Sequence, residues 1–523
     1  MRQISKGLFR ISLLCIALVC LTSAAAQERI VRLGMSLEPG SLDLHADTTT
    51  ASLNVNQAIF ETLVRIDFDG SIIPWLAESW EQLDETTYRF TLREGIRFHS
   101  GEPFNAEAVK AHVERMNNPE DTGLPQAFLG IIEETEILGE YALEFRLSAP
   151  FGPFLSNLAR PHSAIQDTAE YERIGDAFGV NPSGTGPFIM ESWNRGSALS
   201  LRANPEYWGG APQVDGLQFR IIPEDAPRTL ALERGEIHLT TEVPVVDINR
   251  LQANADINLI IELEPRRIHW LMNLEHPILS DITVRRALAH AIDYDFVFEE
   301  ILGEFGARLP GFMTPETFGF VETTYAYDPE LAAALLASAG WELNAQGIYE
   351  HDGQPLQLEI MTGNKMPREG EINEAIQALL REFGVDLRIN LIEGAQIWPN
   401  IARFAEMQHD DRTPDFALLA MDGGMRSGDA NDGLESLFSC GKSRNASQYC
   451  NPEFDRLREI GVSGVPEATR LNAYIQAQFI KYADVPTLPL WQPSWAIATL
   501  TSVEGFRLHP TGSWFYENLS LND

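Results

Sequence analysis

One loop of this 523-residue chain carries charged side chains of both signs on a flexible backbone. The loop covers residues 421–433, is rich in glycine and aspartate, and follows a strand-like apolar run at 415–420. Asp422 or Asp429 would pair with an ammonium group, and Arg426 would bind a carboxylate through two parallel hydrogen bonds. Ligands of open α/β sheets bind at loops that follow the carboxyl ends of strands. The pattern therefore predicts a site for a solute with both charges, and an exposed flexible loop is the equal alternative.

Three tryptophans are candidates for the apolar walls of such a site, because ligand clefts are lined mainly by hydrophobic and aromatic side chains. They are Trp398, Trp491 and Trp495. For each of them taken alone, packing in a core is at least as good an interpretation.

The sequence contains none of the common catalytic motifs. It has no His-Glu-x-x-His zinc motif, no Gly-x-Ser-x-Gly nucleophile turn and no Gly-x-x-x-x-Gly-Lys phosphate loop. The short run at 184–186 reads Gly-Thr-Gly, but Pro187 follows it and lacks the amide that would bind an anion, so we interpret it as a tight turn. The eleven histidines are scattered, without the spacing of metal ligands. We expect no catalysis, no metal and no cofactor; an exported hydrolase whose site is assembled from distant residues is the alternative.

The first 26 residues are typical of a cleavable secretory signal peptide. Basic residues precede an apolar run at 11–21, and small residues lead to Ala26, after which we expect cleavage. The run is shorter than the roughly 20 residues that a helix needs to span a bilayer. We therefore expect export to the periplasm, with a membrane anchor as the alternative.

Two cysteines, Cys440 and Cys450, remain after that cleavage, ten residues apart around a polar loop. An exported protein meets an oxidising compartment, so we expect them to form a disulfide. Closing so short a loop stabilises the fold by about 2–3 kcal/mol in the chain-entropy account. A metal site is the alternative, but two thiols with no histidine nearby fill only half of a tetrahedral site.

Composition and length exclude several other classes of protein. The formal net charge of −36 disfavours binding to nucleic acids, whose phosphates it would repel. With 44% hydrophobic and 22% charged residues, the chain does not resemble a disordered protein. More than 490 residues after cleavage exceed what one hydrophobic core usually supports, so we expect two or three lobes.

The elements that must position these side chains alternate between strand and helix. Alternating apolar and polar residues predict strands at 30–35, 87–92 and 141–147. Capping residues and apolar spacings of three and four predict helices at 105–116, 280–292 and 328–339. A strand, a helix and a second strand are predicted at 357–361, 371–383 and 385–391. Because a helical connection joins parallel strands, we expect a mixed α/β protein.

Several stretches of the chain, in the same order, resemble the family 5 extracellular solute-binding proteins. They are Phe60–Leu63 with Pro74–Trp80, Leu92–Val109, Gly184–Phe188, Ala203–Gly210, Ala231–Ile237, Val284–Asp293 and Tyr327–Trp341. Each stretch alone is moderately specific, but so many in register make chance agreement remote. They cover most of the chain that follows the signal peptide.

The resemblance implies the fold of a periplasmic-binding-protein-like clamp of type II, with two lobes, an extra subdomain and a hinge of two crossing segments. Its implied boundaries are 27–265 plus 488–523 for lobe I, about 60–185 for the subdomain, 266–487 for lobe II, and hinge segments near 264–270 and 488–494. A ligand that contacts both lobes would stabilise the closed form and so shift the population towards it.

The resemblance also implies a function and partners. It implies a monomeric periplasmic receptor that delivers di- or oligopeptides, or a similar amphoteric solute, to an ABC permease with its ATPase subunits. A receptor for a metal chelate, an opine or a sugar is the alternative. In peptide-binding members an acidic residue of the loop at 421–433 binds the ligand ammonium, which matches Asp422 or Asp429. An arginine before the helix at 371–383 binds the carboxylate, and Arg368 is its nearest match.

Overall fold

The computed structural model describes residues 28–522 except 119–128, 364–365, 367, 394–395, 398, 402–415, 425–427 and 510. The largest sheet among the described residues is a mixed sheet of twelve strands. They are β1 (Ile30–Met35), β8 (Phe188–Asn194), β9 (Ala198–Ala203), β10 (Gly216–Ile221), β11 (Leu239–Thr240), β12 (Ile257–Leu263), β13 (Arg266–Met272), β14 (Gly306–Arg308), β18 (Gln357–Thr362), β19 (Asp386–Leu391), β20 (Leu418–Gly424) and β21 (Thr487–Leu500). The order is β19-β18-β20-β13-β21-β11-β1-β10-β9-β8, with β12 and β14 also paired to β21.

A separate antiparallel sheet has the order β4-β5-β7-β6. Its strands are β4 (Ala77–Gln82), β5 (Thr87–Leu92), β6 (Ile132–Gly139) and β7 (Ala142–Leu147). Short strands form β2 (Val64–Ile66) with β3 (Ile72–Pro74), β15 (Glu342–Leu343) with β16 (Tyr349–His351) and β17 (Gln354–Pro355), β22 (Val503–Glu504) with β25 (Ser520–Leu521), and β23 (Arg507–Leu508) with β24 (Trp514–Phe515).

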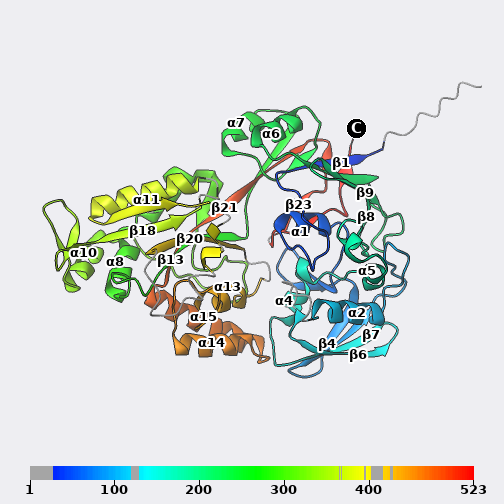
Figure 1. The fold of residues 1–523 in the computed structure, drawn as a ribbon, viewed down its shortest axis with the longest axis horizontal. Coiled ribbons are helices and arrows are strands. Elements are labelled where there is room, and N and C mark those ends of the chain that lie inside the picture. Colours follow the sequence, from blue (N-terminus) through cyan, green and yellow to red (C-terminus); the bar gives the residue numbers. More distant parts are fainter. Residues whose placement is uncertain are drawn as a thin grey trace, which may run out of the picture.

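The α-helices pack around these sheets (Figure 1). They are α1 (Thr50–Asn56), α2 (Ala106–Met116), α4 (Phe154–Leu158), α5 (Thr168–Ile174), α6 (Asp225–Glu233), α7 (Ile248–Gln252), α8 (Ile282–Ala291), α9 (Tyr294–Phe296), α10 (Pro329–Ser338), α11 (Glu369–Phe383), α13 (Asn431–Phe438), α14 (Pro452–Val462) and α15 (Glu467–Asp484).

The elements expected from local sequence patterns are confirmed, because caps and periodicity act locally. The strand predicted at 87–92 is β5 over the same residues. Asn105 caps α2 by accepting a hydrogen bond from the amide of Ala108, as its position before the helix predicts. The strand–helix–strand unit is β18, α11 and β19, and the two strands are parallel. The observed class is therefore the mixed α/β class that the alternation predicts.

The buried side chains form separate cores in two parts of the molecule. Two clusters join residues of β1 to β12 with residues of the second half of β21 and of the chain after it, and we call this the N-terminal part. Two others join residues from β13 to α15, which we call the C-terminal part. Each part therefore has a hydrophobic core of its own, and Phe305 packs against clusters of both parts.

The chain crosses between the two parts along paired strands in the middle of the large sheet. Residues 494–500 of β21 pair with β12 of the N-terminal part, and residues 487–491 pair with β13 of the C-terminal part. The second crossing is the short link from Leu263 to Arg266, where the amide of Glu264 donates to the carbonyl of Pro493 at 2.9 Å. In Figure 1 the long strand β21 runs from one part to the other.

Cys440 and Cys450 form the expected disulfide, with their Cα atoms 4.6 Å apart. It closes the loop between α13 and α14. Among the described residues, no helix combines the length and the apolar character that a membrane span requires.

Candidate functional site

A cavity of about 420 Å³ lies beside the two crossing segments. This volume falls in the usual range of roughly 300–1,000 Å³ for small-molecule sites. Its wall comes from both parts of the molecule and from the crossing itself. The residues that line it include Ser36, Thr50, Asn54, Arg228, Glu242, Val243 and Trp514 of the N-terminal part, Glu264, Pro265, Ser494 and Trp495 of the crossing, and Arg266, Phe305 and Met366 of the C-terminal part.

Hydrogen bonds between the two crossing segments fix the side of this cavity that they form. The side-chain amide of Gln492 donates to the carbonyl of Glu264 at 2.8 Å, which ties the two crossing segments together. The ring of Trp495 lies against Gly512, where an added Cβ would come within 3.2 Å of the indole. Gly512 has φ +82°, a left-handed conformation that glycine adopts without strain. The chain after β21 therefore contacts the Trp495 indole through Gly512 and limits its movement.

The N-terminal wall has its charges paired. The guanidinium of Arg228 donates to Asp225 Oδ1 at 2.6 Å and to the carbonyl of Glu242 at 2.9 Å, and its side chain is only 2% exposed. The carboxylate of Glu242 accepts hydrogen bonds from the amide and the hydroxyl of Ser36, both at 2.9 Å. These bonds preorganise the wall, because side chains that are already fixed lose little entropy when a ligand arrives.

Groups of opposite charge meet where the chain enters the C-terminal part. Glu264 Oε2 lies 3.8 Å from Arg266 Nε, and the Glu264 side chain is 6% exposed. The guanidinium of Arg266 also contacts the sulfur of Met366 at 3.4 Å. The cavity thus combines a carboxylate, a guanidinium and apolar surface from Trp495, which is the chemistry that an amphoteric solute with an apolar side chain requires.

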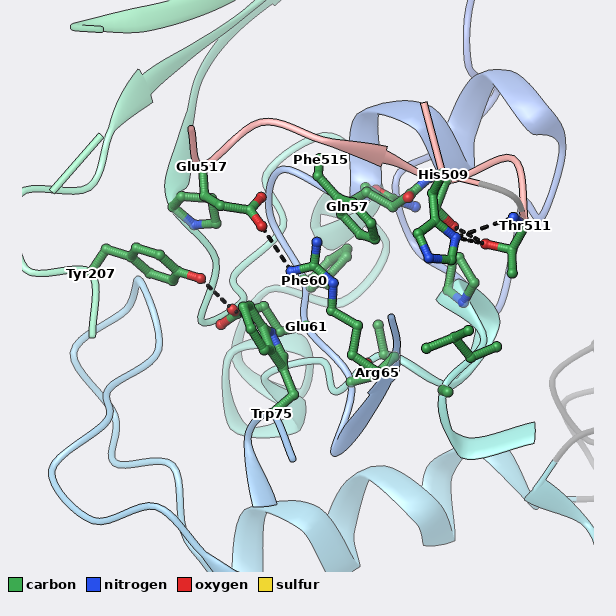
Figure 2. Close-up of a pocket in the computed structure, with 18 residues that line it drawn as sticks. Gln57, Phe60, Glu61, Arg65, Trp75, Tyr207, His509, Thr511, Phe515 and Glu517 are labelled. Carbon is green, nitrogen blue, oxygen red and sulfur yellow. Dashed lines mark hydrogen bonds and ion pairs between the residues drawn. The ribbon is translucent and has the colours of Figure 1, made fainter. Parts of the chain in front are cut away.

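A second, smaller hollow of about 60 Å³ lies wholly within the N-terminal part (Figure 2). It holds a few waters at most, since one water needs roughly 10–15 Å³ by this kind of measure. The guanidinium of Arg65 donates to Glu517 at 2.8 Å and lies 3.3 Å from the centre of the Phe515 ring. This ion pair joins the C-terminal tail to β2. The hollow is therefore a structural junction between these two segments and not a solute site.

The centre of that junction is the buried carboxylate of Glu61. It accepts hydrogen bonds from the indoles of Trp75 and Trp208, both at 2.9 Å, and from the hydroxyls of Thr185 and Tyr207, both at 2.7 Å. Burial raises the pKa of Glu61 to about 7, although all four hydrogen bonds act to lower it. Four of the stretches that carried the resemblance therefore meet at this buried carboxylate inside the N-terminal part. They are Phe60–Leu63, Pro74–Trp80, Gly184–Phe188 and Ala203–Gly210.

A larger hollow of about 760 Å³ lies between α2 and β6. Its wall, which includes Asn117 and Asn118, belongs to the N-terminal part alone. In the chain as described, no group of three or more histidine, cysteine, aspartate or glutamate side chains could hold a metal ion.

The three tryptophans expected at the site do not share one location in the structure. Trp495 lines the cavity between the two parts. Trp491 is fully buried in the core of the C-terminal part, with its ring centre 6.0 Å from that of Phe298, so core packing is its role there. Trp398 lies outside the described residues.

The charged residues expected at the site, Asp429 and Arg368, do not line the cavity between the two parts. Asp429 is 2% exposed, accepts a hydrogen bond from Tyr474 at 2.9 Å and pairs with Arg470 at 2.5 Å, all within the C-terminal part. Arg368 precedes α11 and pairs with Glu371 at 2.7 Å. Asp422 pairs through its backbone with Ile268, and its side chain lies outside what is described, as does Arg426.

Sequence reasoning missed the cavity residues Arg228, Glu242, Glu264, Arg266 and Trp514. No motif marks them, because they come from four separate stretches, around 228, 242, 264–266 and 514, that only the fold brings together. The one available signal was the expected hinge near 264–270, which is where the cavity lies.

Comparisons with known proteins give a consistent match. The family model described as "Bacterial extracellular solute-binding proteins, family 5 Middle" matches residues 71–445. The chain is 27% identical to "Di/tripeptide-binding protein 2" of Pseudomonas aeruginosa (strain UCBPP-PA14), over 99% of each chain. It is 26% identical to "Dipeptide-binding protein" of Escherichia coli (strain K12), over 99% of this chain and 98% of that one.

Two solved structures share the fold. NikA from Brucella suis in complex with Fe(III)-EDTA has a TM-score of 0.83 and 25% identity, covering 94% of this chain and 99% of that one. A dipeptide binding protein from Pseudoalteromonas sp. SM9913 in complex with Met-Leu has a TM-score of 0.78 and 22% identity, covering 94% and 100%.

Proposed function

Because the chain belongs to family 5 of the bacterial extracellular solute-binding proteins, we propose that it captures short peptides in the cavity between its two parts. The family consists of solute-binding proteins, so this is a binding protein and not an enzyme. It delivers its solute to the permease and ATPase subunits of an ABC importer. The periplasm is the compartment in which we propose that it works, after removal of a signal peptide at residues 1–26.

The observation that carries the peptide proposal is the composition of the cavity. About 420 Å³ accommodates a di- or tripeptide, while a long peptide would exceed it. Glu264 and Arg266 offer opposite charges to a zwitterion, and Trp495 offers apolar surface to a side chain. The names of the two relatives that match over nearly the whole chain support the same ligand class.

The proposed mechanism is closure of a clamp. The lobes are residues 27–265 with 488–523 and residues 266–487, and the crossing segments are the hinge. A peptide that contacts both walls of the cavity would stabilise the closed form by its differential affinity for it. The permease would then recognise the closed form.

The test is direct measurement of the bound solute. We expect native mass spectrometry of the purified protein, followed by denaturation, to release di- or tripeptides. We also expect a panel of dipeptides to raise the melting temperature. If metal chelates, opines or sugars raise it and no peptide does, the peptide proposal is wrong and the alternative holds.

A cavity variant links this binding to the site. Trp495→Ala should weaken peptide binding about 10- to 100-fold, because a central aromatic contact is lost. Trp80→Ala, on β4 and outside the cavity, is the matched control and should leave the dissociation constant unchanged. Equal affinities for the wild type and Trp495→Ala would remove the cavity as the peptide site.

A further inference from the structure

The two parts of the molecule also touch on the side away from the crossing strands. The guanidinium of Arg160, just after α4, donates to both carboxylate oxygens of Asp432 on α13, at 2.9 and 3.4 Å. The Arg160 side chain is 8% exposed and that of Asp432 is 23% exposed. Figure 1 shows α4 facing α13 below the crossing strand β21. This ion pair is therefore a largely buried bridge between the two parts.

A second contact lies next to this bridge. The amide of Gly152 in the N-terminal part donates to the carbonyl of Val462, the last residue of α14, at 2.6 Å. A Cβ added at Gly152 would lie 2.2 Å from Arg470 Nε. Arg470 cannot retreat without loss, since it donates to the carbonyl of Gly461 at 2.7 Å and to Asp429 at 2.5 Å. The backbone at Gly152 of the N-terminal part thus packs directly against the Arg470 guanidinium of the C-terminal part, which its own hydrogen bonds hold in place.

Shape complementarity extends the contact on the same side. A Cβ added at Gly464 would lie 3.2 Å from both the carbonyl oxygen of Glu85 and the side chain of Pro150. Small residues at 152 and 464 therefore let the two backbones approach closely. Contacts of this kind exist only when the two parts are together.

The charge distribution makes the bridge reversible. Burial lowers the pKa of Arg267 to about 10, and the attraction of Asp432 partly opposes this lowering. The guanidinium of Arg267 also lies against Gly433, the residue next to Asp432, where an added Cβ would clash with Arg267 Nη2. Asp432 therefore keeps a cation of its own part nearby when Arg160 leaves. Because an unpaired buried charge is what makes breaking an ion pair costly, this second partner lowers the cost of opening.

We propose that the Arg160–Asp432 ion pair and the packing of Gly152 against Arg470 form a latch that holds the two parts closed without a bound solute. Every group in this contact is supplied by the protein, so closure gains free energy before any ligand contributes. The latch rests on the proposed clamp motion and regulates the same cavity. It sets how much of the empty protein is closed, and its release is the step that opens the cavity.

The test measures the distance between the two parts in protein freed of solute by unfolding and refolding. Spin labels are attached at Glu136→Cys on β6 and Gln476→Cys on α15, both exposed positions. The latch predicts one short distance for the parent protein. Arg160→Ala should convert most of the population to a longer distance.

A second variant tests the contact without a change of charge. Gly152→Ala should open the protein in the same way, because its methyl group clashes only when the two parts meet. The matched control is Arg115→Ala, which breaks the buried pair of Arg115 with Asp43 inside the N-terminal part and should leave the short distance unchanged. An empty parent protein with the long distance, or one that keeps the short distance in both latch variants, overturns the proposal.

This readout separates the latch from the ligand class. If no peptide binds but both latch variants open the empty protein, the latch stands and the peptide proposal fails. If peptides bind and the latch variants do not change the distance in the empty protein, the peptide proposal stands and the latch fails.

Discussion

Replacement of Glu61 by glutamine should change how the stability of the N-terminal part depends on pH. The carboxylate is 6% exposed and accepts four hydrogen bonds from side chains of three separate segments. Burial raises its pKa from the ordinary 4.5 to about 7. Glutamine keeps the shape of the side chain and removes its titration.

The sign follows from proton linkage. Between pH 4.5 and 7 the unfolded chain loses the Glu61 proton while the folded protein keeps it. The contribution of this group to stability is therefore complete below pH 4.5 and is lost as the pH rises through 7. A rise from 4.5 to about 7 corresponds to about 3 kcal/mol.

Urea denaturation followed by tryptophan fluorescence at pH 5, 6, 7 and 8 measures the effect. The difference in unfolding free energy between the parent protein and Glu61→Gln should shrink by about 2.5 kcal/mol as the pH rises from 5 to 8. Glu134→Gln, at an exposed carboxylate on β6, is the control and should show no such trend.

The opposite trend would refute this reasoning. A difference that grows with pH would mean that the four donors outweigh burial and keep Glu61 ionised. Peptide affinity should stay the same in Glu61→Gln, because Glu61 does not line the cavity between the two parts. A loss of affinity at unchanged stability would place Glu61 in the binding site.

Reduction of the Cys440–Cys450 disulfide should cost about 2–3 kcal/mol of unfolding free energy, and an unchanged melting temperature in dithiothreitol would contradict this. Burial lowers the pKa of Lys481 to about 7, so that group's contribution should make stability rise with pH between 7 and 10.5. Lys481→Met should remove this slope and raise stability at pH 7 by about 2–3 kcal/mol; a less stable variant in urea denaturation would refute it. Asp429→Ala should cost about 3–5 kcal/mol, because it leaves the guanidinium of Arg470 unpaired in a site where its side chain is 11% exposed. Unchanged stability with weaker peptide binding would instead return Asp429 to the ligand site.

The sequence predicted the local elements well, because their causes are local. Asn105, Asp281 and Asp328 each cap the helix that follows, and the alternation at 87–92 is a strand. Cys440 and Cys450 were paired correctly from their spacing and from the expectation of export. The order of the short stretches also indicated the family, without showing what those stretches do.

The site could not be derived in the same way. The loop at 421–433 had the right residue types, but the carboxylate of Asp429 pairs with Arg470, which lies 41 positions further along the chain. Trp491 and Trp495 are four residues apart on one strand, and only the second lines the cavity. Side chains of one residue type thus differ in role according to the neighbours that the fold provides.

The sequence by itself determined the class of the protein, its disulfide, and the helices and strands that caps and periodicity specify. The tertiary structure alone decided that Glu264, Arg266 and Trp495 share a cavity, that four donors converge on Glu61, and that Arg160 reaches Asp432. The physical reason is range. Caps and alternation act within a few residues, whereas the burial and charge pairing that make a site depend on segments hundreds of residues apart that meet only in the folded sheet.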